Sequence, residues 1–170
     1  VNYECWDNWV EYYQDKGYKC VTIKFPQRDK SVEELRAEHP NPKVGQVSLP
    51  DTINHIISVI KSLDEKPIII GHSFGGMLTQ LMINRDLGVA GVAIDSVPPQ
   101  GLLSFKFSFL RSTFPILNPL TSSPWLMSFK HFQYAFANGM PLREQKQAYE
   151  EIIVPESLRI ARGGLGPSAH

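Results

Sequence analysis

A serine between two glycines, in the run Gly71–Gly75 (GHSFG), is the part of this sequence best suited to chemistry. Three isoleucines, Ile68–Ile70, lead into the run, and a helical pattern of apolar residues follows it. Gly-x-Ser-x-Gly at a strand-to-helix turn is typical of a nucleophile elbow, which holds its serine in strained backbone geometry. We therefore predict that Ser73 is a nucleophile.

The neighbours of this serine suit acyl transfer. Phe74 would open the helix, where its backbone N–H and the helix dipole favour a developing oxyanion. Gly71 and Gly75 are expected to supply the small size that the turn needs, and Gly76 the room where the helix leaves the sheet. We predict that His72 and Phe74, the two variable residues of the motif, contact substrate. The alternative is an idle serine in an ordinary glycine-rich turn.

The composition predicts one globular domain and limits the classes of partner that we expect. The 170 residues are 42% hydrophobic, and 17 basic residues balance 17 acidic ones, so no nucleic-acid or anionic-membrane partner is expected. No apolar run is long enough for a transmembrane segment. We expect no cofactor or metal, and a cytoplasmic location. Cys5 and Cys20 are expected to be reduced, buried thiols, with a single disulfide as the alternative.

The segments before the serine read as scaffold. The apolar stripe of residues 5–16 predicts a helix that ends at Gly17, and the alternation in Tyr18–Phe25 predicts a strand. Residues 26–49 predict a surface loop with a short helix from Ser31 to Glu38. Residues 50–63 predict an amphipathic helix, capped by Ser48 or Asp51.

A second buried strand is predicted at Val89–Ile94, and Asp95 follows it. Strands that alternate with helices in this order predict a parallel sheet with right-handed crossovers. Ligands bind such sheets at the carboxyl ends of the strands. Ser73 and Asp95 both fall at such ends, and they would lie beside each other if the two strands are neighbours.

The segment 96–143 has a different composition. It contains no Asp or Glu, and half of the chain's Phe, Trp and Tyr residues lie between Phe105 and Phe136. Such a segment could bound an apolar pocket and exclude water, or it could be a pair of helices packed through buried phenylalanines. His131 lies within it and is expected to serve packing.

The run GHSFGG resembles the α/β-hydrolase family, whose lipases and esterases often carry Gly-His-Ser-x-Gly-Gly at this turn. The resemblance implies an α/β fold: a parallel central sheet with flanking helices, incomplete here, and an aromatic-rich helical lid after the strand that ends at Asp95. It divides the chain into a core at 1–98, a lid at 99–150, and a return segment with a linker-like tail at 151–170.

The resemblance also implies a serine, an acid and a histidine in that chain order, which only Ser73, Asp95 and His170 can fill. The strands that usually precede the acid and the histidine are not visible, nor is the loop that gives the second oxyanion donor. We therefore expect this chain to be a nearly inactive fragment that self-associates through sheet edges.

The function implied is a serine hydrolase that acts on an apolar ester or related acyl substrate through an acyl-enzyme on Ser73. The same turn also serves thioesterases, acyltransferases, C–C bond hydrolases and cofactor-free haloperoxidases. The alternative is a non-catalytic binding or interaction protein that keeps the turn but lacks a complete triad.

Overall fold

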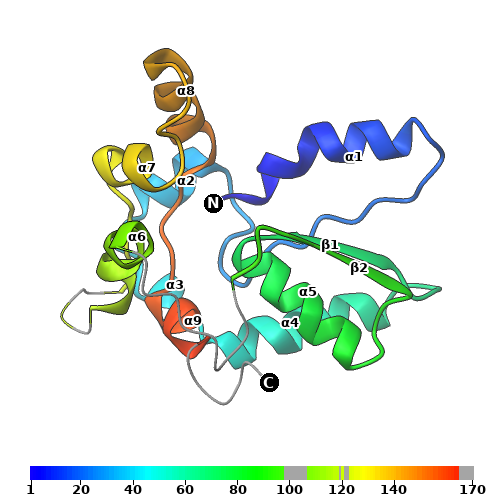
Figure 1. Ribbon diagram of the computed structural model, residues 1–170. Helices are drawn as coiled ribbons and strands as arrows, with labels where there is room; N and C mark the ends of the chain where they lie inside the picture. The colour runs from blue at the N-terminus through cyan, green and yellow to red at the C-terminus, as the bar shows by residue number, and fades with distance from the viewer. Residues whose placement is uncertain (98–106, 119, 121–122, 165–170) are drawn as a thin grey trace. The chain divides into compact units, whose positions relative to one another are not determined.

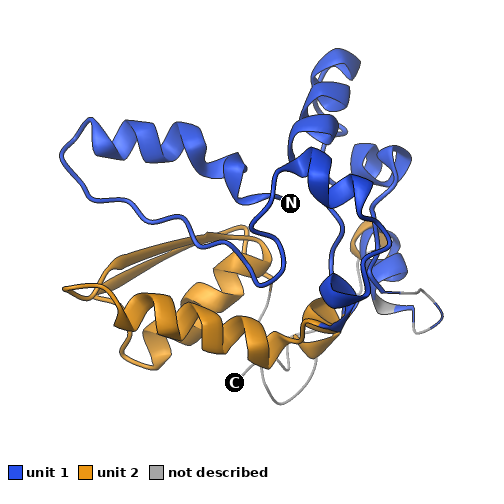
Figure 2. Ribbon diagram, turned by 180° about the vertical axis from the view of Figure 1, so that it is seen from behind, with its two compact units in different colours: residues 1–46, 111–158 blue, residues 47–110, 159–170 orange. Residues whose placement is uncertain are grey.

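The computed structural model describes residues 1–97, 107–118, 120 and 123–164. The chain separates into two compact units. Unit 1 comprises residues 1–46 and 111–158, and unit 2 comprises residues 47–110 and 159–170 (Figure 2). No described helix is long and apolar enough to cross a membrane.

Unit 2 is built around a small parallel sheet. Its elements are α4 (Leu49–Lys61), β1 (Ile68–His72), α5 (Phe74–Asn84) and β2 (Ala90–Ile94), with parts of α6 (Phe107–Leu117) and α9 (Leu158–Gly163). β1 and β2 pair in parallel, with Ile68 opposite Ala90 and His72 opposite Ile94. α5 packs on both strands, and α4 lies beside α5 (Figure 1). The predicted α/β fold with a parallel sheet is confirmed.

Much of the core of unit 2 comes from α4 and α5. The buried apolar residues of α4 and α5 are Leu49, Ile53, Ile56, Ile60, Met77, Leu78, Leu81 and Met82. Ser48 caps α4 in a capping box with Asp51, as predicted from the sequence. The methionines therefore serve packing.

The expectation that both strands are buried was wrong. Ile68 is 54% exposed and Val92 is 45% exposed. Among the described elements, α5 makes the most extensive contacts with the two strands. Gly91, by contrast, lies against α5: a Cβ there would come within 2.7 Å of Ile83. The described sheet has two strands, so each strand has one edge without a described partner. Self-association through these edges stays a prediction.

Unit 1 is mainly helical. Its elements are the 3₁₀ turn η1 (Tyr3–Trp6), α1 (Asp7–Gln14), α2 (Val32–Ala37), α3 (Pro42–Gln46), α7 (Phe129–Ala135) and α8 (Leu142–Ile152). The predicted helix over 5–16 is confirmed by η1 and α1. Gly17 ends it at φ 86°, and the N–H groups of Gly17 and Tyr18 donate to Gln14 and Tyr13.

Three expectations for unit 1 need correction. Tyr18–Phe25 is not a strand: it pairs with no described strand, and Tyr18 and Val21 are more than half exposed. A strand needs a ladder partner, which alternation alone does not supply. The loop expected at 26–49 holds α2, capped by Ser31 as predicted, but also α3 and the start of α4. Cys5 and Cys20 are free, as expected, but neither is buried.

The second half of unit 1 has a small core of its own. Met127, Phe132, Ala137 and Ile153 are buried together, and partly buried side chains from α7 and α8 pack around them. Phe132 stacks on Phe136, with ring centroids 6.2 Å apart. His131 lies edge-on to Trp125, with centroids 5.6 Å apart, in keeping with the packing role expected for it. Some aromatic residues of the predicted lid therefore serve packing.

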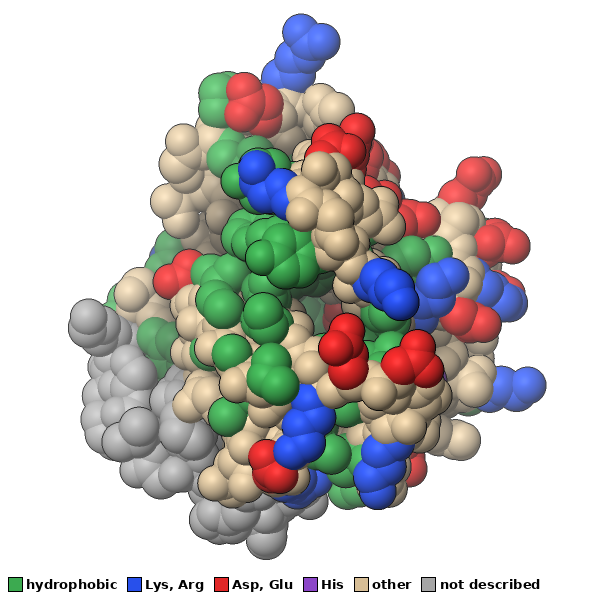
Figure 3. Space-filling view, turned by 90° about the vertical axis from the view of Figure 1, so that its right-hand side faces the viewer, with side chains coloured by type: hydrophobic (Ala, Val, Ile, Leu, Met, Phe, Trp, Pro, Cys, Tyr) green, Lys and Arg blue, Asp and Glu red, His purple; other side chains and the backbone are tan. Residues whose placement is uncertain are grey.

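Apolar side chains also reach the surface. Figure 3 shows them on one face of the molecule, beside charged side chains of both signs. The largest exposures on α6 are those of Phe107, at 76%, and Phe114, at 64%.

Candidate active site

Ser73 lies at the turn between β1 and α5, where the sequence placed it. Its backbone has φ 55° and ψ −115°, which L-residues rarely adopt. Four backbone hydrogen bonds hold this geometry, the longest of them from the Met77 N–H to the Ser73 carbonyl at 3.4 Å. The Ser73 N–H donates to the Ile94 carbonyl at 2.9 Å, and the Ser73 carbonyl accepts from the N–H groups of Val97 and Gly76, each at 3.0 Å. The strained residue is therefore tied both to its own helix and to the segment after β2.

The glycines of the motif have unequal roles. A Cβ on Gly71 would come within 2.5 Å of Thr79 Oγ1 and closer still to the Gly75 carbonyl. A Cβ on Gly76 would come within 2.9 Å of the Ser96 Cβ, so the room predicted for Gly76 is present. The expectation for Gly75 was wrong, because a Cβ there meets no described atom within 4 Å. Gly71 is required because the first turn of α5 lies directly on the strand.

The start of α5 offers unpaired donors. Phe74 and Gly75 open the helix, and their N–H groups have no hydrogen-bond partner among the described residues. Orphan N–H groups at a helix N-terminus, together with the dipole, stabilise negative charge. Phe74 is the next residue after Ser73, so its N–H is placed to donate a hydrogen bond to an anion formed at the Ser73 side chain.

Asp95 lies at the neighbouring strand end, as predicted for adjacent parallel strands. The register places His72 opposite Ile94, so Ser73 and Asp95 each follow a paired residue. Asp95 has φ 42°, is exposed, and makes no hydrogen bond within the described part of the chain. Asp95 is thus a second residue at positive φ at the carboxyl end of this sheet. No described hydrogen bond holds its side chain in place.

The histidines are not brought to Ser73 by any hydrogen bond. No described histidine bonds the Ser73 Oγ, and His170 lies outside the described residues. His72 is exposed at the end of β1, and Phe74 is half-buried. Their predicted substrate contacts therefore stay predictions.

The comparisons with known proteins place this geometry in a family. The sequence profile of the alpha/beta hydrolase family matches residues 2–167. The chain belongs to the alpha/beta hydrolase family. Its fold is similar to the solved structure of the methylesterase protein MES16 from Arabidopsis, with a TM-score of 0.55 and 14% sequence identity. The similarity covers 99% of this chain and 69% of that one, and no curated protein matches the sequence. Membership of this hydrolase family supports an enzyme of the hydrolase class.

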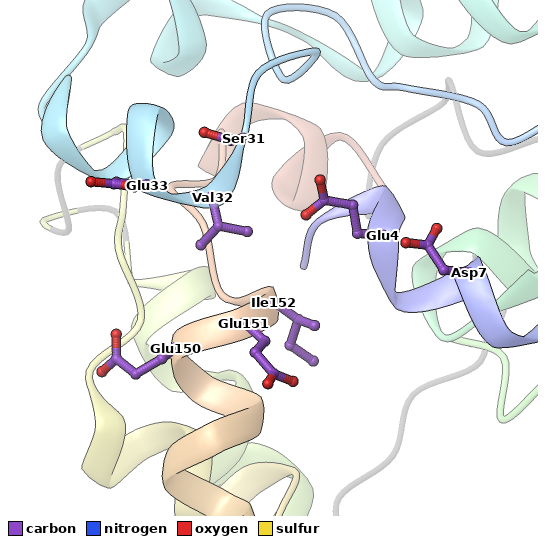
Figure 4. A pocket seen from close by; sticks show the side chains of 8 residues that line it. All are labelled: Glu4, Asp7, Ser31, Val32, Glu33, Glu150, Glu151 and Ile152. Carbon is purple, nitrogen blue, oxygen red and sulfur yellow. The ribbon is translucent and has the colours of Figure 1, made fainter.

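A hollow in unit 1 has unsuitable chemistry for this family's reactions. Figure 4 shows its lining, which sequence reasoning did not single out: Glu4, Asp7, Ser31, Val32, Glu33, Glu150, Glu151 and Ile152. Five of these eight are carboxylic acids, which would repel an oxyanion. The residues described form no group of His, Cys, Asp or Glu suited to a metal ion. Of these two places among the described residues, the β1–α5 turn is the better candidate, because it offers free N–H groups to an oxyanion.

Arg36 joins α2 to α8 near this hollow and neutralises one of the carboxylates that line it. Its guanidinium forms an ion pair with Glu150 and donates to the carbonyls of Tyr149, at 2.6 Å, and Ile153, at 2.8 Å. Glu150 is thereby compensated as a structural charge. We call these contacts of Arg36 with Tyr149, Glu150 and Ile153 the polar staple of unit 1, and the hollow borders it.

Proposed function

We propose that this alpha/beta hydrolase cleaves an ester or related acyl compound of apolar character through an acyl-enzyme on Ser73. The geometry of Ser73 carries the proposal: φ 55°, both backbone groups hydrogen-bonded, and the free N–H of Phe74 at the helix start. In the proposed step the Ser73 Oγ attacks the acyl carbon, its proton passes to a base, and the Phe74 N–H donates to the oxyanion. The leaving alkoxide takes up a proton, and water then releases the acid.

The test is covalent labelling with a fluorophosphonate, which phosphonylates an activated serine. Labelling should be confined to Ser73, and Ser73→Ala should abolish it. Ser58→Ala is the matched control, because Ser58 is an exposed serine on α4 that donates to the His55 carbonyl. Labelling that survives Ser73→Ala, or that stops in Ser58→Ala, would refute the assignment.

Asp95 is proposed as the acid that orients the base, since it occupies the neighbouring strand end. Asp95→Asn should then lower the labelling rate by roughly tenfold or more without changing the labelled residue. Asp64→Asn, another exposed carboxylate in unit 2, is the control and should leave the rate unchanged. Equal rates in both variants would remove Asp95 from the mechanism.

The preference for apolar acyl groups is supported by the aromatic, acid-free segment within residues 99–150. Phe107 and Phe114 on α6 are its most exposed described phenylalanines. Phe107→Ser and Phe114→Ser should flatten the preference for longer acyl chains in a series of p-nitrophenyl esters. Tyr12→Ser on α1, 57% exposed, is the control. An unchanged chain-length profile in the folded variants would contradict a role for α6 in selectivity.

A non-catalytic acyl-binding protein is the second candidate. It is favoured by one observation: no described residue hydrogen-bonds the Ser73 Oγ as a base would. Such a protein would bind the apolar ester analogue saturably, without Ser73-dependent labelling. Labelling that needs Ser73 decides for the enzyme.

A further inference from the structure

The segment after β2 reaches the strained serine through a short chain of hydrogen bonds. The Val97 N–H donates to the Ser73 carbonyl at 3.0 Å. The Val97 carbonyl accepts from the Ser96 hydroxyl at 2.8 Å, and the Ser96 Oγ accepts from Gln80 Nε2, also at 2.8 Å. Val97, whose N–H donates to Ser73, is therefore connected to the second turn of α5.

This connection closes a loop, because Ser73 is the N-cap residue of α5 and Gln80 lies seven residues farther along the chain. Gly76, between them, makes the closure possible. A Cβ at Gly76 would come within 2.9 Å of the Ser96 Cβ and 3.1 Å of its Oγ, so only glycine admits Ser96 at this separation. The absence of a side chain at Gly76 thus has a specific purpose: it brings the Ser96 hydroxyl within reach of Gln80.

The segment that carries Val97 needs such a restraint. Asp95, immediately before Ser96, has φ 42°, so the chain leaves β2 through an unfavourable turn. β2 ends at Ile94, so no ladder hydrogen bond fixes residues 95–97. The described hydrogen bonds that fix Ser96 and Val97 are those to Gln80 and Ser73.

We propose that Gln80 and Ser96 are positioning residues for Ser73, and that their hydrogen-bonded relay through Val97 holds the serine in its reactive backbone geometry. Neither residue touches the reacting atoms. The inference rests on the proposed function and adds to it a source for the strain at Ser73. Loss of the relay would let Ser73 relax toward an ordinary φ, which moves its Oγ away from the Phe74 N–H.

The hydrogen bond between Gln80 and Ser96 has a fixed direction, and a nearly isosteric substitution removes its donor. Gln80 must donate, because the Ser96 hydroxyl already spends its one hydrogen on the Val97 carbonyl. Gln80→Glu keeps the size but cannot donate, and Ser96→Ala removes the hydroxyl without changing the charge. Gln80→Lys keeps a donor and should restore part of the function. Asn84→Asp, one turn farther on the exposed face of α5, makes the same change of charge without touching the relay.

Two measurements on the full chain separate positioning from mere stability. The first is residue-resolved hydrogen exchange, in which protection of the Val97 amide should fall roughly tenfold in Gln80→Glu and Ser96→Ala. The amides of β1 and β2 should keep their protection. The second is the rate of fluorophosphonate labelling at Ser73, which should also fall roughly tenfold in both variants, be partly restored in Gln80→Lys, and stay unchanged in Asn84→Asp.

The double variant sharpens the test. If Gln80 and Ser96 act through one relay, combining Gln80→Glu with Ser96→Ala should slow labelling no further than either change alone. Unchanged protection at Val97, or lost protection with an unchanged labelling rate, would overturn the positioning role. Lost protection at Val97 in a chain whose Ser73 is never labelled would instead overturn the proposed function and leave the relay standing.

Discussion

The two units of this hydrolase hold their chains in different ways. In unit 2 the backbone itself is bent: Ser73 sits at φ 55° because Gly71 lets α5 lie on β1 and because backbone hydrogen bonds surround the serine. In unit 1 polar side chains tie distant segments together, as Arg36 does between α2 and α8. The difference teaches where to expect function, because strain that costs stability persists only where the surrounding structure enforces it.

The largest effect is expected at Gly71. Gly71→Ala should destabilise the chain by about 3 kcal/mol, because the new Cβ meets the backbone of α5 at Gly75 as well as the Thr79 hydroxyl, and the backbone cannot move aside as a flexible side chain would. Gly75→Ala is its matched control and should be neutral or stabilising by about 0.5 kcal/mol, since alanine suits a helix better and no described atom obstructs it. Chemical denaturation of the two variants measures the contrast. Similar losses in both would contradict the unequal roles of the motif's glycines.

The next effect tests the polar staple of unit 1. Arg36→Ala should cost about 2 kcal/mol, because it leaves two backbone carbonyls without their charged donor. Arg36→Lys should recover less than half of this loss, since an ammonium cannot reproduce the guanidinium fork. The exposed pair of Lys30 and Glu38 provides the comparison, and Lys30→Ala should leave the stability nearly unchanged. Equal losses for Arg36 and Lys30 would mean that unit 1 does not depend on this staple.

A gain in stability is expected from removing the strain at Ser73. Ser73→Gly should raise the free energy of unfolding by about 1 kcal/mol, because glycine adopts positive φ without the Cβ penalty. Ser73→Ala, which keeps the Cβ, should leave stability nearly unchanged, although both variants lose labelling. A loss of stability in Ser73→Gly would show that the turn is not strained.

The smallest effect is a pH dependence in unit 1. Burial raises the pKa of Glu156, but the Arg28 guanidinium and the Val1 ammonium, which both form ion pairs with this carboxylate, together hold its pKa below its usual value. The contribution of Glu156 should therefore be complete above the ordinary glutamate pKa of about 4.3. It should be lost as the pH falls through the lower pKa of the folded state.

Denaturation of the parent chain and of Glu156→Gln between pH 6 and pH 3 measures this contribution, about 0.5–1 kcal/mol. The difference between them should shrink as the pH falls. Glu33→Gln, at an exposed residue of α2 that forms no described ion pair, should show no such change. A difference that grows toward acid would reverse the sign of the argument.

Local signals in the sequence were sufficient to predict the turn that carries Ser73. Ser73 between small residues, after three isoleucines and before a helical pattern, predicted the turn, and Ser31 and Ser48 predicted two helix starts. Non-local information was missing elsewhere. Tyr18–Phe25 alternates as a strand does, but pairing depends on a neighbour that alternation does not specify. The exposure of Val92 likewise depends on what covers the sheet.

The hydrogen bond from Gln80 to Ser96 also could not be predicted from the sequence. Its residues lie 16 positions apart, and neither belongs to a recognisable motif. Gly76 was the one local hint, because a third glycine beside the motif indicated a close approach. The partner in that approach, Ser96, became evident only from the packing of the segment after β2.

The most direct test of the central claim is to trap the acyl-enzyme. The chain is mixed with p-nitrophenyl butyrate, quenched in acid at early times, and digested for mass spectrometry. Even if turnover by this chain is as slow as the sequence predicts, a single acylation suffices, so we predict one butyryl group on the peptide that contains Ser73, present in the parent chain and in Ser58→Ala, and absent from Ser73→Ala. A butyryl group on another residue, or none while p-nitrophenol is released, would contradict Ser73 as the nucleophile.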